Sequence, residues 1–197
     1  QGQTPNTQIA LFDFGSTQLV FEVRGLTTAG LQGKKIDNFF HFEKGTLTGG
    51  KFTPKEGGEA IKLPTDHFKL GPGDNHFANF IAAMRSRKRS DLNAEILEGH
   101  YSSALCHLAN ISYRLGELVP FNPRTKAFGD NKEAYETLAR MEEHLAGENG
   151  LKLDGLQYRL GRKLIIDAKS EKIVNDPEAA QMLSCEYRKP FVVPDKA

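Results

Sequence analysis

The apolar pattern of this chain changes its period at residue 74, and that change sets the fold class. Before it, apolar and polar residues alternate in short runs separated by turns, as in QIALFDFGSTQLVFEVRGL at 8–26. Short alternating runs joined by tight turns predict an antiparallel sheet. After residue 74 the apolar residues recur at the spacing of amphipathic helices. The sequence therefore predicts an α+β fold, with strands first and helices after them.

The first predicted hairpin places two charged residues on one face of a strand. Its turn is expected at Gly15–Ser16, and in the strand that follows Glu22 and Arg24 share a face while apolar residues line the opposite one. Two interpretations remain open for this pair. It is either a solvated ion pair that contributes little to stability, or a polar group at the rim of the sheet that faces a ligand.

Further strands and helices have recognisable ends. Strands are expected at 35–43, 46–52 and 59–63, with a turn at Lys44–Gly45. Helices are expected from 74 onward, at about 93–115, at 131–146 and, as a short helix, from Pro177. A connector at 118–129 and a small hairpin at 163–174 complete the expected elements. Asp74 and Asp130 are the expected N-terminal caps, and Gly116 and Gly147 the expected ends.

The stretch GHYSSALCH at 99–107 holds two histidines, two serines and a cysteine within one predicted helix. His100 and His107 are two helical turns, about 10 Å, apart, which is too far for both to bind one metal ion. A Ser- or Cys-dependent hydrolase is an alternative, but the strained Gly-x-Ser-x-Gly turn that exposes a nucleophile is missing. We therefore expect no metal site here, and we expect these residues to pack in the core or at an interface between helices, with His100 in the core.

Two more stretches are interpreted as helix ends. LGPGDNHF at 70–77 matches only part of the Gly-x-Gly-x-x-Gly fingerprint, because His76 occupies the third glycine position, so no nucleotide-binding domain is expected. RSRKR at 85–89 follows a predicted helix, where cations complement the helix dipole. The formal net charge is only +1, so we expect neither nucleic acid nor a membrane as a partner.

The chain has two cysteines, Cys106 and Cys185, which are too few for a disulfide framework. Cys106 is flanked by the apolar residues Leu105 and Leu108. Both cysteines are expected to be reduced and buried.

Three long segments together resemble one known family. They are TPNTQIALFDFGSTQLVFEVRGL at 4–26, DNHFANFIAAMRSRKRSDLNAEILEGHYSSALCHLANISYRLG at 74–116, and YRLGRKLIIDAKSEKIVNDPEAAQMLSCEYRKPFVVP at 158–194. They look like the C-terminal part of the glucose–fructose oxidoreductase/inositol dehydrogenase/MocA family, in its bacterial branch with a long C-terminal extension. The resemblance covers essentially the whole chain and rests on extended similarity, not on a short catalytic signature.

The resemblance implies a domain organisation. Members join an N-terminal Rossmann domain, which binds NAD or NADP, to a C-terminal α+β domain with a large, open, mostly antiparallel sheet and helices packed on one face. Residues 1–120 would then form the sheet and two helices of the substrate and oligomerisation domain, and 121–197 an extension packed on the same domain. The Rossmann domain is expected to be absent from these residues and to precede residue 1.

The resemblance assigns few site residues to this chain. The glycine fingerprint and the Glu-Lys-Pro motif belong to the Rossmann part, and the Asp and His that move the hydroxyl proton normally precede the first strand seen here. No catalytic, cofactor-binding or metal-binding residue is therefore carried over. Arg24 is expected to contact substrate, because its strand resembles the one whose end faces substrate in relatives, and His76 is a second candidate contact.

The expected function follows from this resemblance. The chain would be the substrate-binding and oligomerisation domain of an NAD(P)-dependent oxidoreductase that acts on a carbinol of a sugar, sugar derivative or cyclitol, and it would be inactive alone. Its expected partners are its own Rossmann domain, further copies of itself through the open sheet face, and a sugar-like substrate. The alternative is a stand-alone, sheet-based binding or assembly module without redox activity.

Overall fold

A computed structural model of the chain describes residues 4–64 and 70–193. The chain divides into two compact units, one formed by Gln1–Thr27 with Tyr101–Ala197 and the other by Thr28–His100. Helices and small antiparallel sheets make up the chain, so the prediction of an α+β fold is confirmed at that level. The strands of the described residues form four separate sheets of two to four strands, not one large sheet.

The first unit begins with the expected hairpin. Strands β1 (Gln8–Asp13) and β2 (Gln18–Val23) pair antiparallel. The turn between them contains Gly15 at φ +82°, in the left-handed region that favours glycine, and the Asp13 carboxylate accepts a hydrogen bond from the Gly15 amide at 2.8 Å. Because an isolated two-stranded ribbon is only marginally stable, this hairpin needs a covering element.

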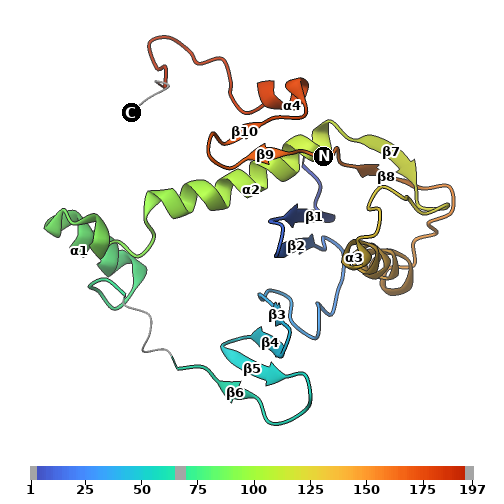
Figure 1. Cartoon of the computed structure of the whole chain (residues 1–197), viewed down its shortest axis with the longest axis horizontal. Coiled ribbons are helices and arrows are strands. Elements are labelled where there is room, and N and C mark those ends of the chain that lie inside the picture. Colours follow the sequence, from blue (N-terminus) through green and yellow to red (C-terminus); the bar gives the residue numbers. More distant parts are fainter. Residues whose placement is uncertain (1–3, 65–69, 194–197) are drawn as a thin grey trace. The chain divides into compact units, whose positions relative to one another are not determined.

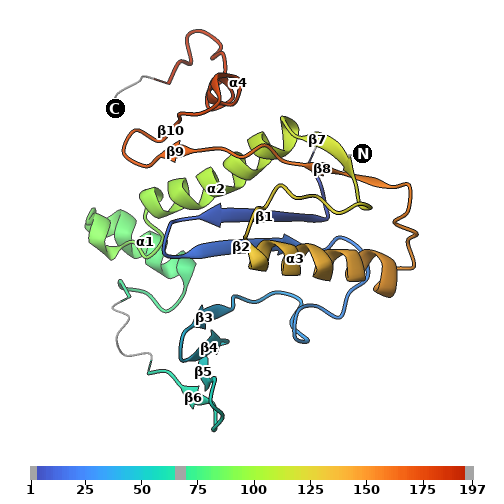
Figure 2. The same cartoon turned by 45° about the vertical axis from the view of Figure 1, so that its right-hand side comes forward.

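Helix α3 (Lys132–Glu143) supplies that cover along one face of the hairpin (Figure 2). Its first turn is capped by the Asn131 side chain, which accepts from the Ala134 amide at 3.0 Å, so the cap lies one residue after the expected Asp130. The helix continues as a π-helical turn, His144–Glu148, that includes the expected stop residue Gly147. The buried face of this segment consists of Ala134, Thr137, Leu138, Met141 and His144.

A second cluster of the same unit forms around the end of helix α2 (Ile96–Arg114). Strand β7 (Glu117–Pro120) pairs with β8 (Gln157–Leu160), so the expected connector at 118–129 begins as a strand. The predicted hairpin forms as β9 (Ile166–Asp167) and β10 (Lys172–Ile173), and the short helix as α4 (Pro177–Gln181). The core here is small, with Ile111, Ile173 and Ala179 buried.

The second unit contains a four-stranded meander of β3 (Phe40–Phe42), β4 (Gly45–Thr48), β5 (Lys51–Pro54) and β6 (Ile61–Lys62) (Figure 1). Its first strand is shorter than the expected 35–43, and the turn lies at Glu43–Lys44, one residue earlier than expected. Gly45 already pairs in β4, where a Cβ would lie 2.3 Å from the Thr53 carbonyl oxygen. That close approach requires glycine at the start of the strand.

Helix α1 (His76–Ser86) belongs to the same unit, followed by a 3₁₀ turn at Arg89–Asp91. Its N-cap is Asn75, not the expected Asp74, and the Asn75 side chain accepts from the amides of Phe77 and Ala78. The apolar stripe of α1 is exposed: Phe77 (71 %), Phe80 (60 %), Ile81 (42 %) and Met84 (48 %). Within the described part of the chain, no helix has the length and apolar character needed to cross a membrane.

Candidate functional site

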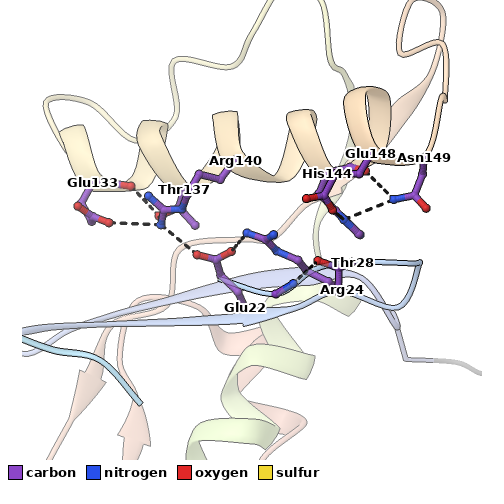
Figure 3. A network of polar contacts seen from close by, with 10 residues as sticks. Glu22, Arg24, Thr28, Glu133, Thr137, Arg140, His144, Glu148 and Asn149 are labelled. Carbon is purple, nitrogen blue, oxygen red and sulfur yellow. Dashed lines mark hydrogen bonds and ion pairs between the residues drawn. The ribbon is translucent and has the colours of Figure 1, made fainter. Parts of the chain in front are cut away.

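The Glu22–Arg24 pair of the first hairpin is not solvated. The two side chains are only 14 % and 13 % exposed, and Arg24 donates to Glu22 through Nη2 at 3.1 Å. The apolar residues of the opposite face are the more exposed ones, with Leu19 at 40 % and Phe21 at 48 %. The interpretation as a solvated ion pair is therefore wrong, because α3 covers the charged face of the hairpin (Figure 3).

Arg140 of α3 also binds the carboxylate of Glu22. Its Nη2 donates to the second oxygen of Glu22 at 2.9 Å and to the hydroxyl of Thr137 at 2.8 Å, and it lies 3.4 Å from Glu133. Partial burial lowers the pKa of Arg140, but the hydrogen bond and charge of Glu22, with the charge of Glu133, hold that pKa above its ordinary value. Arg140 thus remains a cation, and Glu22 bridges two guanidinium groups.

His144 occupies the same face of α3 one turn later. Its side chain is fully buried, its Nδ1 lies 2.8 Å from a carboxylate oxygen of Glu148, and its Nε2 is buried without a hydrogen-bond partner in the structure. Asn149 anchors the end of this segment by donating to the His144 carbonyl at 2.7 Å and to the Thr27 carbonyl at 3.1 Å. We call the group formed by Glu22, Arg24, Glu133, Thr137, Arg140, His144, Glu148 and Asn149 the β2–α3 seam.

Chemically, the β2–α3 seam presents a guanidinium that is held in place by its neighbours. A guanidinium has five N–H donors in a rigid plane, and Arg24 directs one of them at Glu22. Such a group suits recognition of hydroxyl or carboxylate oxygens. Arg24 therefore retains its place as a candidate substrate contact, now as part of a network.

His76, the second candidate contact, lies at the start of α1 in the other compact unit. It lines a pocket of about 500 Å³ together with Asn75, Asn79, Phe80 and residues of 92–96. Asn79 is 2 % exposed and serves the local fold, because its amide donates to the Pro72 and Asp91 carbonyls. Since Arg24 and His76 belong to different units, each is a separate candidate.

The glycines before α1 are used for packing and do not form a phosphate cradle. A Cβ at Gly73 would lie 2.5 Å from the Asn79 amide nitrogen, and one at Gly71 would lie 2.1 Å from the Asp91 carbonyl oxygen. The Gly71 amide already donates to Asn93 at 2.7 Å. These residues therefore do not fit the diphosphate of a nicotinamide dinucleotide.

The GHYSSALCH stretch does not pack in the core. His100, Ser102, Ser103, Cys106 and His107 are all exposed on α2. The expectation of core or helix-interface packing, including core packing of His100, is wrong, because the buried residue that α2 contributes to the core of the described chain is Ile111, near its end. Among the described residues, no group of three or more His, Cys, Asp or Glu side chains could hold a metal ion.

The expectation for the two cysteines is only half correct. Cys106 and Cys185 are free thiols, as predicted, but both are exposed.

An Asp-x-x-x-His pattern occurs at Asp37–His41, after the first hairpin. In the family that the sequence resembles, this pattern is expected before the first strand. The two side chains have separate partners: Asp37 accepts from Thr48 at 3.1 Å, and His41 lies 3.1 Å from the Thr46 hydroxyl. The pattern therefore does not form an Asp–His pair.

Sequence reasoning missed the α3 half of the seam. The available signal was a cation and a histidine four residues apart, Arg140 and His144, next to the apolar Met141 on an amphipathic helix. No protein-family model, no curated protein and no solved structure matches the chain.

Proposed function

We propose that this chain is the substrate-binding and oligomerisation domain of an NAD(P)-dependent oxidoreductase of the glucose–fructose oxidoreductase/inositol dehydrogenase/MocA family. The substrate would be a carbinol of a sugar, sugar derivative or cyclitol. The resemblance of the three long sequence segments supports the family, and the α+β composition is compatible with it.

The observation that carries the proposal is the restrained Arg24 at the end of β2. Its guanidinium is held by Glu22, and Glu22 is held by Arg140. A donor fixed in advance binds a substrate oxygen at a smaller entropic cost than a free side chain. In the proposed reaction Arg24 binds and orients the oxygen-rich substrate, while hydride transfer takes place on the nicotinamide of the cofactor domain.

The exposed apolar side chains support the proposal that partners cover parts of this chain. Within the second unit, α1 leaves Phe77, Phe80 and Met84 exposed, and in the first unit the hairpin exposes Leu19 and Phe21. Contiguous apolar surface of this kind marks interaction sites. We assign the α1 stripe to the cofactor domain and the open hairpin face to further copies of the chain. His100, which is exposed, would lie at the seam with the cofactor domain.

The cofactor, NAD or NADP, would be bound by the domain that precedes this one. The Gly71–Gly73 loop does not fit a diphosphate, so no catalytic step is derived for the cofactor from these residues.

The test is a dehydrogenase assay of the complete gene product. NAD and NADP are supplied in turn with a panel of aldoses, sugar acids and inositols, and nicotinamide reduction is followed by absorbance. We expect turnover with at least one member of the panel and a loss of kcat/KM of about tenfold to a hundredfold in Arg24→Ala, which corresponds to about 1.4–2.8 kcal/mol of lost binding to the transition state.

The matched control is Arg124→Ala, because Arg124 also pairs with a carboxylate of α3, Glu142. The control should retain the wild-type kcat/KM. Absence of any dinucleotide-dependent turnover would favour the alternative, a binding or assembly module without redox activity.

A further inference from the structure

We propose that Arg140 is a positioning residue that orients Arg24 through Glu22. The proposal rests on the proposed function only in giving Arg24 a substrate to contact. Arg140 lies 118 residues after Glu22 in the sequence. A C-terminal segment of the chain would thus hold the guanidinium of Arg24, at the end of β2, in place. Arg140 itself does not touch substrate in this proposal.

Glu22 alone would hold Arg24 weakly. The two residues are neighbours on one face of the same strand end, and they share a single hydrogen bond at 3.1 Å. A long side chain held at one point keeps much of its rotational freedom, which is why isolated ion pairs contribute little. The second oxygen of Glu22 accepts from Arg140 at 2.9 Å, so both carboxylate oxygens are bound and the plane of the carboxylate is fixed.

Arg140 is fixed in turn by the body of α3. Its Nη2 donates to the Thr137 hydroxyl at 2.8 Å, and that hydroxyl donates to the Glu133 carbonyl at 2.8 Å. Thr137 is fully buried, so its hydroxyl has a defined direction. A continuous set of hydrogen bonds therefore runs from the backbone of α3 through Thr137, Arg140 and Glu22 to Arg24 (Figure 3).

A positioning role differs from a general contribution to stability, and the helix offers a matched comparison. Arg124 donates through two nitrogens to Glu142 on the same helix, and among residues 4–64 and 70–193 no hydrogen bond or ion pair connects this pair with Arg24. Removing Arg124 deletes its ion pair with Glu142, and removing Arg140 deletes its ion pairs with Glu22 and Glu133. Only the loss of Arg140 frees an oxygen of the carboxylate that holds Arg24.

The experiment measures the rotation of the Arg24 guanidinium by nitrogen-15 NMR of arginine side chains, with no ligand added. The signal is assigned by its loss in Arg24→Lys. In the wild type we expect slow rotation about the Nε–Cζ bond. In Arg140→Ala we expect rotation about tenfold faster, which corresponds to the loss of about 1.4 kcal/mol of restraint. In Arg124→Ala the rate should stay at the wild-type value.

Two conservative variants keep the test decisive if Arg140→Ala does not fold. Arg140→Lys keeps the positive charge and can still donate to Glu22, but it lacks the planar guanidinium whose Nη2 donates to both Glu22 and Thr137, so the Arg24 guanidinium should rotate at an intermediate rate. Thr137→Val removes the hydroxyl that accepts a hydrogen bond from Arg140, and it should also make the rotation of the Arg24 guanidinium faster.

An unchanged Arg24 signal in the Arg140 variants, or an equal change in Arg124→Ala, would overturn the proposal. Because no substrate is used, failure of the proposed function would appear separately, as absent dehydrogenase turnover in a protein whose Arg24 is restrained.

Discussion

Replacing Glu22 by glutamine should loosen α3 from the hairpin more than any other single loss of charge in the β2–α3 seam. The substitution keeps the shape of the side chain and removes the charge that two guanidinium groups share, at 3.1 Å to Arg24 and 2.9 Å to Arg140. Hydrogen bonds between charged groups contribute roughly 1.5–3 kcal/mol each when they are shielded from water. Arg140 is 34 % exposed, so water compensates part of its loss, and we expect a net cost of about 2–3 kcal/mol.

The assay is native-state hydrogen exchange of the α3 amides, which reports the free energy of opening of that segment without requiring the whole chain to unfold in one step. Glu133→Gln is the control, because Glu133 is 52 % exposed and lies 3.4 Å from Arg140. The control should cost at most about 0.5 kcal/mol. A Glu22→Gln cost below about 0.5 kcal/mol, or an equal cost in both variants, would refute the conclusion that Glu22 anchors the seam.

Three further results are expected. The hydrogen bond from Arg162, with that from the Ala179 amide, holds the pKa of Asp176 below its ordinary value, so the stability that Asp176 gives α4 is present above about pH 4 and is lost as the pH falls through the lowered pKa. The Ala179 amide signal should show this loss of α4 stability as an acid transition in the wild type. The transition should disappear in Asp176→Asn, and its persistence there would contradict the assignment. Leu138→Ala, at a side chain 5 % exposed, should destabilise α3 by about 2–5 kcal/mol in the same exchange assay, whereas Leu118→Ala, at 56 %, should stay within about 0.5 kcal/mol. Both exposed thiols, Cys106 and Cys185, should react with a thiol reagent in the native protein, and titration of fewer than two per chain would mean that one is covered.

Local signals in the sequence predicted most of the elements correctly. Asp13 and Gly15 specify the first turn, and an acidic or amide side chain begins α3 and α4 within one residue of the expected place. These features depend on neighbours along the chain, which is why pattern and capping chemistry find them.

Which side chains are buried could not be predicted from the sequence. Periodicity shows that Phe77, Phe80 and Met84 share a face of α1, but it does not show whether anything covers that face. Cys106 has apolar sequence neighbours, yet adjacent residues of a helix point in different directions, so the thiol is exposed. The contact between Glu22 and Arg140 joins segments 118 residues apart, and no local pattern encodes it.

The most direct test of the proposed function is calorimetric titration of NAD and NADP into two proteins, this chain alone and the complete gene product that contains it. The account predicts no binding heat for the chain alone, because the Gly71–Gly73 loop packs closely against Asn79 and Asp91 and does not fit a diphosphate. For the complete product it predicts saturable binding. Micromolar binding by the chain alone, or no dinucleotide binding by the complete product, would contradict it.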